Sequence, residues 1–164
     1  GMTTASLPAL TGAQMPAGSS VQMVSVKTGA LATGTTTMPN DNTIVQNTEG
    51  NEYMTLAITP TSASNKLVIE SIWNGFASNN EAFMISLFQD STANALGTVW
   101  SQNVQERGQY ILRHVMTAGT TSATTFKIRA GSSAGGTTSF NGISGAARFA
   151  GTMASTIVIT EYKA

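Results

Sequence analysis

The stretch ITPTSASNKLVIESIW, residues 58–73, contains the strongest fold signal in the chain. Pro60 cannot donate a hydrogen bond to a sheet and disfavours helix at the residue before it, so a strand is expected to end at Thr59. Ser62 and Asn65 can bond their own backbone and stabilise a turn. The residues after them alternate between apolar and polar. The pattern predicts a β-hairpin with one strand on each side of this turn.

The same alternation recurs along the chain, at intervals filled by Gly, Ser and Asn. This rhythm is typical of sandwiches and barrels, and it predicts an all-β fold: an antiparallel, jelly-roll-like β-sandwich of roughly eight strands. A long loop or short edge strands are expected between residues 27 and 48, and a glycine-rich surface loop over 130–142. The expected strands are residues 20–26, 51–59, 66–76, 82–90, 97–102, 109–117, 124–130 and 155–162.

Composition narrows the classes of partner. Charged residues make up only 10% of the 164, and eight Lys and Arg balance eight Asp and Glu. A chain with no net positive charge and no basic cluster is poorly suited to bind nucleic acid. Near-zero net charge instead removes one barrier to self-association. The chain contains no Cys, which excludes disulfides and thiolate chemistry.

Two regions are expected along the chain. Residues 1–19 contain two of the four prolines and no periodic apolar pattern, which predicts an N-terminal arm or linker. Residues 20–164 are expected to form a single β-sandwich domain, a size that suits one core. No apolar run is long enough for a membrane-spanning helix, and no secretory signal is recognised, so membrane insertion is not expected.

The sequence offers little support for catalysis, and no enzyme is predicted. The only histidine, His114, lies in an expected strand and shares a face with apolar residues, which favours a packed or interface role. Glu70 and Glu161 also lie in expected strands and are interpreted as outward-facing or salt-bridged acids. The stretch NDNTIVQNTEGNE at 40–52 has acids and amides, but its spacing departs from a calcium loop beyond Asp41. No metal, cofactor or catalytic residue is predicted.

Several aromatic residues stand at the ends of expected strands, where loops could expose them. An exposed aromatic side chain beside Asn or Gln is suited to stack on a sugar, although a core position is the commoner state for aromatics. The residues assigned as candidate receptor or glycan contacts are Trp73, Asn79, Asn80, Trp100, Arg107 and Tyr110.

Three segments resemble a known family. MPAGSSVQMVSV at 15–26 and ITPTSASNKLVI at 58–69 are similar to motifs of bacteriophage tail-fibre and related virion β-sandwich domains. STIVITEY at 155–162 resembles their closing strand, with Glu161 at the usual acidic position. Asn65 departs from the pattern, where Ser usually precedes the Lys. The resemblance implies a non-enzymatic structural or receptor-binding module of the virion, commonly a homotrimer attached to a fibre shaft or another virion protein.

Together these observations favour a trimeric phage or prophage tail-fibre domain that recognises a host-surface glycan. One alternative is a capsid head-fibre or decoration protein. A second is a carbohydrate-binding module or lectin unconnected to a virion, and a third, less favoured, is a depolymerase that cleaves bacterial polysaccharide.

Overall fold

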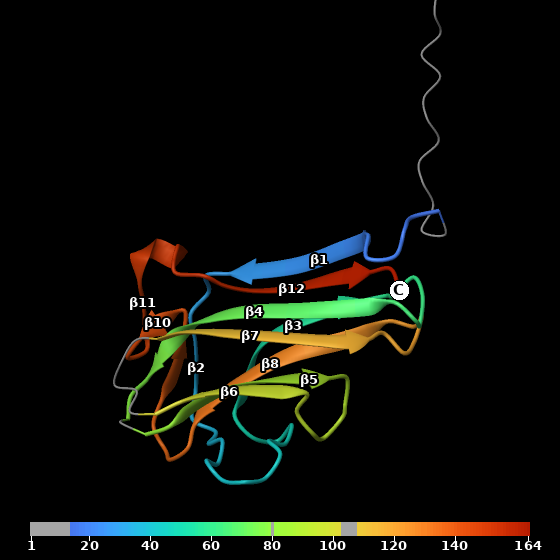
Figure 1. Cartoon of the computed structure of the whole chain (residues 1–164). Helices are drawn as coiled ribbons and strands as arrows, with labels where there is room; N and C mark the ends of the chain where they lie inside the picture. Colours follow the sequence, from blue (N-terminus) through green and yellow to red (C-terminus); the bar gives the residue numbers. More distant parts are fainter. Residues whose placement is uncertain (1–13, 80, 103–107) are drawn as a thin grey trace, which may run out of the picture.

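The chain folds into two main antiparallel β-sheets packed face to face and a separate two-stranded sheet of residues 142–143 and 146–147, as the computed structural model shows (Figure 1). Residues 14–79, 81–102 and 108–164 are described. The fold is all-β, as the sequence predicts. The strands are β1 (Ser20–Thr28), β2 (Ala32–Gly34), β3 (Asn51–Ile58), β4 (Lys66–Ala77), β5 (Phe83–Gln89), β6 (Gly97–Ser101), β7 (Gly108–Thr117), β8 (Thr124–Ser132), β9 (Thr138–Phe140), β10 (Gly142–Ile143), β11 (Ala146–Ala147) and β12 (Ser155–Tyr162), with a 3-10 turn at Phe149–Gly151.

The first sheet is organised around the long strand β4. On one side β4 pairs with β12, which pairs with β1; on the other side it pairs with β7. The far end of β4 continues beyond β12 and pairs with β9, which in turn pairs with β2. β4 is therefore the strand that connects the other strands of the six-stranded sheet.

The second sheet has four strands in the order β3-β8-β5-β6. β5 is buried along nearly its whole length, which explains why FMISLFQ is an almost continuous apolar run rather than an alternating one. Contacts between β6 and β7 curl the two sheets toward each other along one side, so that the sandwich resembles a half-barrel (Figure 1).

The predicted hairpin at residues 59–65 is wrong. β3 pairs with β8 in the four-stranded sheet, whereas β4 lies in the other sheet, so the connection crosses from one layer to the other. Period-2 alternation shows which face of each strand is buried, but it does not show whether consecutive strands are neighbours. The turn chemistry is as expected, and the pairing is different.

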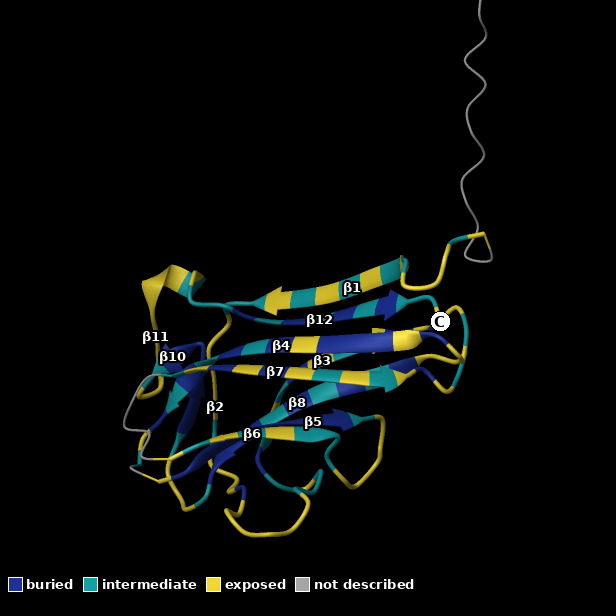
Figure 2. Ribbon diagram, in the orientation of Figure 1, coloured by how far each residue is buried: buried dark blue, intermediate teal, exposed yellow. Residues whose placement is uncertain are grey.

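Residues from both sheets form one buried core, and the strand positions of buried residues are dark blue in Figure 2. Trp73 stands at the centre and its ring centroid lies 5.0–5.9 Å from those of Phe83, Phe140, Tyr53 and Tyr110. A bulge in β3 between Glu52 and Met54 breaks the alternation there. Large aromatic surfaces of this kind dominate core energetics.

All eight expected strands are present, but the structure adds short ones. β2 lies in the stretch expected to hold a loop or edge strands. The glycine-rich segment at 130–142, expected to be a surface loop, instead contributes β9, and Thr138, Ser139, Phe140 and Asn141 are all buried. A glycine-rich composition hides this strand because its apolar signal is a single Phe.

Candidate functional site

A hollow of about 440 Å³ opens beside the exposed face of β6, between that strand and the loop before β3. We call it the Trp100 hollow, since the indole of Trp100 borders it with 50% of the residue exposed. Its walls combine apolar and polar side chains. The lining residues are Pro39, Asn40, Asp41, Thr43, Ile44, Val45, Met84, Ala95, Leu96, Gly97, Thr98 and Trp100.

A buried methionine anchors the loop that forms one wall. Met38 is fully buried and packs with Ala82, Met84 and Val45 in a small core of its own. Its backbone N–H donates to Ser132 O at 2.9 Å, and its sulfur accepts a 3.6 Å hydrogen bond from Ser86 Oγ. The polar residues that follow it are thereby held over the edge of the four-stranded sheet.

Hydrogen bonds also tie this loop to the turn between β5 and β6. Ala95 N donates to Val45 O at 2.9 Å, and Asn47 N donates to Ala93 O at 2.8 Å. The Gln46 amide donates to Asn94 Oδ1 at 3.0 Å. Two segments separated by nearly fifty residues therefore build the hollow as one unit, and its shape is set before any ligand arrives.

Asp41 supplies the negative charge of the hollow. Its Oδ1 accepts hydrogen bonds from the Thr43 hydroxyl at 2.5 Å and the Thr43 N–H at 2.8 Å. These bonds, the side-chain bond foremost, hold the pKa of the Asp41 carboxyl below its usual value. At neutral pH the group is thus an ionised acceptor held in a fixed orientation.

This combination suits binding more than catalysis. A flat indole beside fixed acceptors and hydroxyls can stack on the apolar face of a sugar ring while the polar groups bond its hydroxyls. Hydrolysis of a glycosidic bond typically uses two carboxyl groups about 5–9 Å apart. Among the described residues that line the hollow, Asp41 is the only acid.

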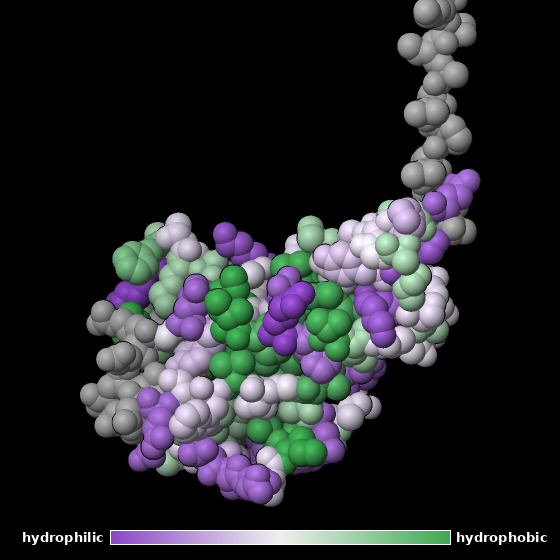
Figure 3. Space-filling model, viewed as in Figure 1, coloured by the Kyte–Doolittle hydropathy of each residue, from purple (hydrophilic) through white to green (hydrophobic). Residues whose placement is uncertain are grey.

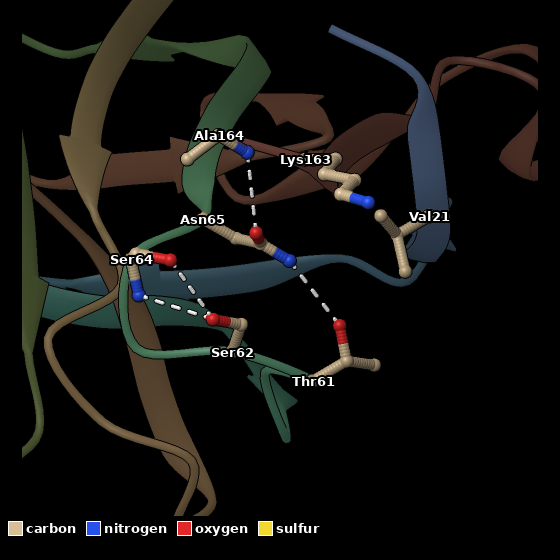
Figure 4. A pocket seen from close by; sticks show the side chains of 7 residues that line it. All are labelled: Val21, Thr61, Ser62, Ser64, Asn65, Lys163 and Ala164. Carbon is tan, nitrogen blue, oxygen red and sulfur yellow. Dashed lines mark hydrogen bonds between the residues drawn. The ribbon is translucent and has the colours of Figure 1, made fainter. Parts of the chain in front are cut away.

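A second hollow lies beside the turn between β3 and β4 (Figure 4). It is lined by Val21, Thr61, Ser62, Ser64, Asn65, Lys163 and Ala164. Its polar groups bond largely to one another: Ala164 N donates to Asn65 Oδ1 at 3.2 Å, and the Ser62 and Ser64 hydroxyls lie 3.0 Å apart. No aromatic residue among those described lines this hollow, so it lacks the stacking surface that Trp100 gives to the other one.

Behind this second hollow, the turn encloses the carboxylate of Glu161. Hydrogen bonds reach it from the amides of Gln22 and Asn65 at 2.6 and 2.7 Å, and from the N–H and hydroxyl of Thr61 at 2.9 and 2.8 Å. Ser62 N adds a fifth donor at 3.3 Å. Burial raises the pKa of Glu161, but the bonds from Gln22, Asn65 and Thr61 outweigh it, and the net pKa lies below the usual value.

Glu161 was predicted to face outward or to form a salt bridge, and this prediction is wrong. The residue has no exposed surface, and its donors are neutral. The prediction holds for Glu70, whose carboxylate lies 3.3 Å from Arg113 Nε on the exposed face of the sheet. His114 is half-buried on the inward face of β7, with Leu112 and Tyr110, as the alternation predicts.

Of the four predicted contact residues that the structure describes, only Trp100 lines an exposed hollow. The predictions for Trp73 and Tyr110 are wrong: both belong to the central aromatic cluster, at 0% and 7% exposed. Asn79 does not line the hollow and lies in a loop where its Oδ1 accepts a bond from Ser132 Oγ at 2.9 Å. Asn80 and Arg107 lie outside the described residues.

Sequence reasoning missed the partners of Trp100, namely Asn40, Asp41, Thr43 and Thr98. The signal for three of them was present, since the stretch starting at Asn40 is dense in amides, acids and hydroxyls, and it was considered only as a calcium loop. Within the described residues, no group of three or more His, Asp or Glu is placed to hold a metal ion.

No family model matches the chain, and no curated protein matches it in sequence. The solved structures similar to it include the EclA C-terminal domain, titled a sugar-binding protein, at 17% identity and a TM-score of 0.40 over 73% of this chain and 74% of that one.

Two larger proteins also resemble the chain in part. Latent PorU from Porphyromonas gingivalis is 7% identical, with a TM-score of 0.40 over 90% of this chain. VP2 of the infectious bursal disease virus subviral particle is 16% identical, with a TM-score of 0.35 over 89%. The chain spans 14% and 39% of those two proteins, respectively. At these TM-scores the likenesses carry no inference about function.

Proposed function

We propose that this domain is a receptor-binding module that recognises a cell-surface glycan through the Trp100 hollow, as part of a bacteriophage fibre. The observation that carries the proposal is the half-exposed indole of Trp100, which borders a hollow with the ionised Asp41 and two threonine hydroxyls. The fibre context is supported by the sequence motifs at 15–26, 58–69 and 155–162. Binding, rather than cleavage, is the proposed activity.

Exposure of the indole is the reason to expect a ligand. Trp is large and mostly buried in folded proteins, so a Trp left half in water beside a preformed hollow marks an interaction surface more often than an accident of packing. The loop that carries Asp41 is anchored by Met38 and cross-linked to the β5–β6 turn. A rigid site of this kind lowers the ordering cost of binding.

The test is binding of the purified protein to an array of bacterial surface polysaccharides, followed by titration of the hits. Trp100→Ala should weaken binding at least about tenfold, because it removes the stacking surface. Asp41→Asn keeps the size of the side chain and removes its charge, and should weaken binding less. Intact ligand recovered after incubation would separate binding from depolymerase activity.

Phe149→Ala is the matched control. Phe149 is the most exposed aromatic residue among those described, at 75%, and it does not line the hollow. Its replacement should leave glycan affinity unchanged. Equal affinity of Trp100→Ala and the unaltered protein, or a loss that Phe149→Ala reproduces, would contradict the proposed site.

A second candidate is a carbohydrate-binding module with no virion context, favoured by the same hollow. Binding to surface polysaccharides of one group of bacteria, with capture of a fibre-shaft or other virion protein, would support the fibre. Binding to plant or storage polysaccharides without such capture would support the second candidate. Among the described residues, none forms a helix long and apolar enough to cross a membrane.

A further inference from the structure

The outer face of the six-stranded sheet carries apolar side chains in a pattern that a solvated face does not require. On β7, Ile111 and Val115 are 60% and 51% exposed. On β4, Val68 and Ile72 lie directly beside them; Val68 is only 8% exposed and Ile72 is half-buried. Figure 3 shows the result as a hydrophobic area, green, around a small hydrophilic centre. Contiguous apolar exposure of this kind typically marks an interaction surface.

The centre of this face is an ion pair. Glu70 on β4 and Arg113 on β7 are directly opposite in the register, with Oε1 and Nε 3.3 Å apart and both side chains more than half exposed. The pairs Val68–Val115 and Ile72–Ile111 flank it on either side. The centre of the face thus consists of an apolar row, a charged row and a second apolar row, and it is bounded by the polar rows Lys66–Thr117 and Asn74–Gln109.

We propose that a second copy of this chain covers this face and forms a two-fold symmetric dimer. The three rows of one copy are complementary to the same three rows of a second copy. A two-fold axis that runs parallel to the strands, midway between β4 and β7, places β7 of the partner over β4 and β4 of the partner over β7. Each side chain then meets its own cross-strand neighbour from the other copy.

The pairing that results is favourable in every row. Val68 meets the second Val115, Ile72 meets the second Ile111, and Glu70 meets the second Arg113. The ion pair therefore appears twice, and the two acids and two bases alternate in a square of four charges. Apolar rows on both sides shield that square from water, which strengthens its attraction and fixes the register of the two sheets.

The charge balance also favours a second copy over another occupant. The face carries one acid and one base at its centre, so a strongly charged partner would leave one of them unmatched. The chain as a whole has no net charge, so two copies do not repel each other at long range. Because three short rows form a small interface, we expect weak association that depends on protein concentration.

The experiment exchanges the charges at Glu70 and Arg113 and measures the mass of the protein in solution. The unaltered protein should approach twice 17.0 kDa as its concentration rises from low micromolar to millimolar. Glu70→Arg places four arginines in the square, and Arg113→Glu places four glutamates there. Each single variant should weaken association at least about a hundredfold and remain monomeric.

Two restorations distinguish direct pairing from loss of fold. An equimolar mixture of the two single variants places two arginines of one chain over two glutamates of the other and should form a heterodimer. The double variant E70R/R113E should form homodimers again. Glu52→Lys is the matched control, since Glu52 belongs to an ion pair with Lys127 on the opposite sheet, and it should leave association unchanged.

The proposal is overturned if the unaltered protein stays monomeric over the whole concentration range, or if the single variants dimerise as it does. A mass of three times 17.0 kDa would also overturn it and would support the homotrimer that the sequence resemblance predicts. Glycan binding is independent of this result, because the Trp100 hollow lies on the other sheet and none of its lining residues belongs to the outer face.

Discussion

Glu161 shows how a single carboxylate can organise a chain crossing. Its donors are Gln22 on β1 and Thr61 and Asn65 in the connection between β3 and β4, so this side chain of β12 joins two segments that are distant from it in sequence. Hydrogen bonds to a charged acceptor are about twice as strong as neutral ones. The Pro-Thr-Ser-Ala-Ser-Asn turn therefore reverses the direction of the chain and also supplies a cradle of hydrogen-bond donors for the Glu161 carboxylate.

Replacing this charge should destabilise the domain. Glu161→Gln has nearly the same shape but presents an NH₂ group to donors that need an acceptor, and we expect a loss of about 2–4 kcal/mol in the free energy of unfolding. Urea titration followed by circular dichroism would measure it. Glu70→Gln, at the exposed ion pair, is the control and should cost less than about 1 kcal/mol. Equal losses for the two variants would contradict the importance of the cradle.

The same residue gives the stability a dependence on acid. The pKa of Glu161 in the folded state lies below 4.5, its ordinary value, so folding favours the ionised form. The stabilisation is fully present above the unfolded pKa and is lost as pH falls through the folded pKa. Unfolding midpoints measured between pH 7 and pH 3 should fall more steeply for the unaltered protein than for Glu161→Gln. Parallel curves would be inconsistent with this assignment.

At the scale of elements, β4 connects most of the molecule. It pairs with β12, β7 and β9, and its inward side chains include Leu67, Ile69 and Trp73. The end of the strand approaches its neighbours closely at Gly75, where a Cβ would overlap the Ser139 carbonyl oxygen and the Trp73 indole. Only glycine lets β9 pack against the end of β4.

Gly75→Ala should therefore separate β9 from β4 or displace Trp73. Overpacking of this kind costs about 1–3 kcal/mol, and the thermal midpoint should fall by several degrees. Differential scanning calorimetry and Trp fluorescence would follow the two effects. Gly135→Ala is the control, because a Cβ there meets no atom within 4 Å. A Gly75→Ala protein as stable as the control would show that the strand end can relax without loss.

The sequence predicts the positions of the long strands correctly, but it does not predict which strands pair. Alternation in KLVIESIW correctly places Leu67, Ile69 and Trp73 on one face of a strand, but only the structure shows that this face is inward, and Trp73 was predicted to be a glycan contact. The same rule says nothing about which strand is adjacent, and this is why the layer crossing at residues 59–65 was predicted as a hairpin. β9 was missed because Ser, Thr and Gly around Phe140 give no apolar period.

In the candidate site, too, a local feature can be predicted from the sequence, whereas contacts between distant segments cannot. Trp100 could be predicted because a lone aromatic residue at the end of a short strand is a local feature. Its companions could not, since Asp41 reaches the hollow only through the burial of Met38 and the hydrogen bonds of Gln46 and Asn47 with the β5–β6 turn. Trp73 and Tyr110 have similar local surroundings to Trp100, and only the central aromatic cluster distinguishes them.

At the scale of the whole molecule, the first and last strands are neighbours. β1 pairs with β12 from Ser20 opposite Tyr162 to Thr28 opposite Ser155, and Gly18 N donates to Lys163 O at 2.8 Å. The two ends of the folded domain therefore lie side by side at one end of the six-stranded sheet (Figure 1).

A circular permutant should consequently fold. Joining Lys163 to Gly18 through a short Gly/Ser linker and opening the chain in the turn at 119–122 leaves every strand intact. We expect the circular dichroism spectrum of the permutant to match that of the unaltered protein, with cooperative unfolding. Opening the chain between Thr61 and Ser62 instead divides the Glu161 cradle and should weaken folding strongly. The reverse order of stability would contradict both arguments.

The antiparallel ladder between β1 and β12 also determines how the domain responds to a pulling force. Tension applied between Ser20 and Tyr162 acts at one end of the ladder and loads its hydrogen bonds one pair at a time, so the strands should peel apart at low force. Tension applied between Ser20 and a ligand held at Trp100 passes along β1 and across the sandwich, and it loads many bonds together. In the proposed fibre, a domain built in this way would resist a cell that drags on the proposed glycan ligand, and it would yield when its own ends are drawn apart.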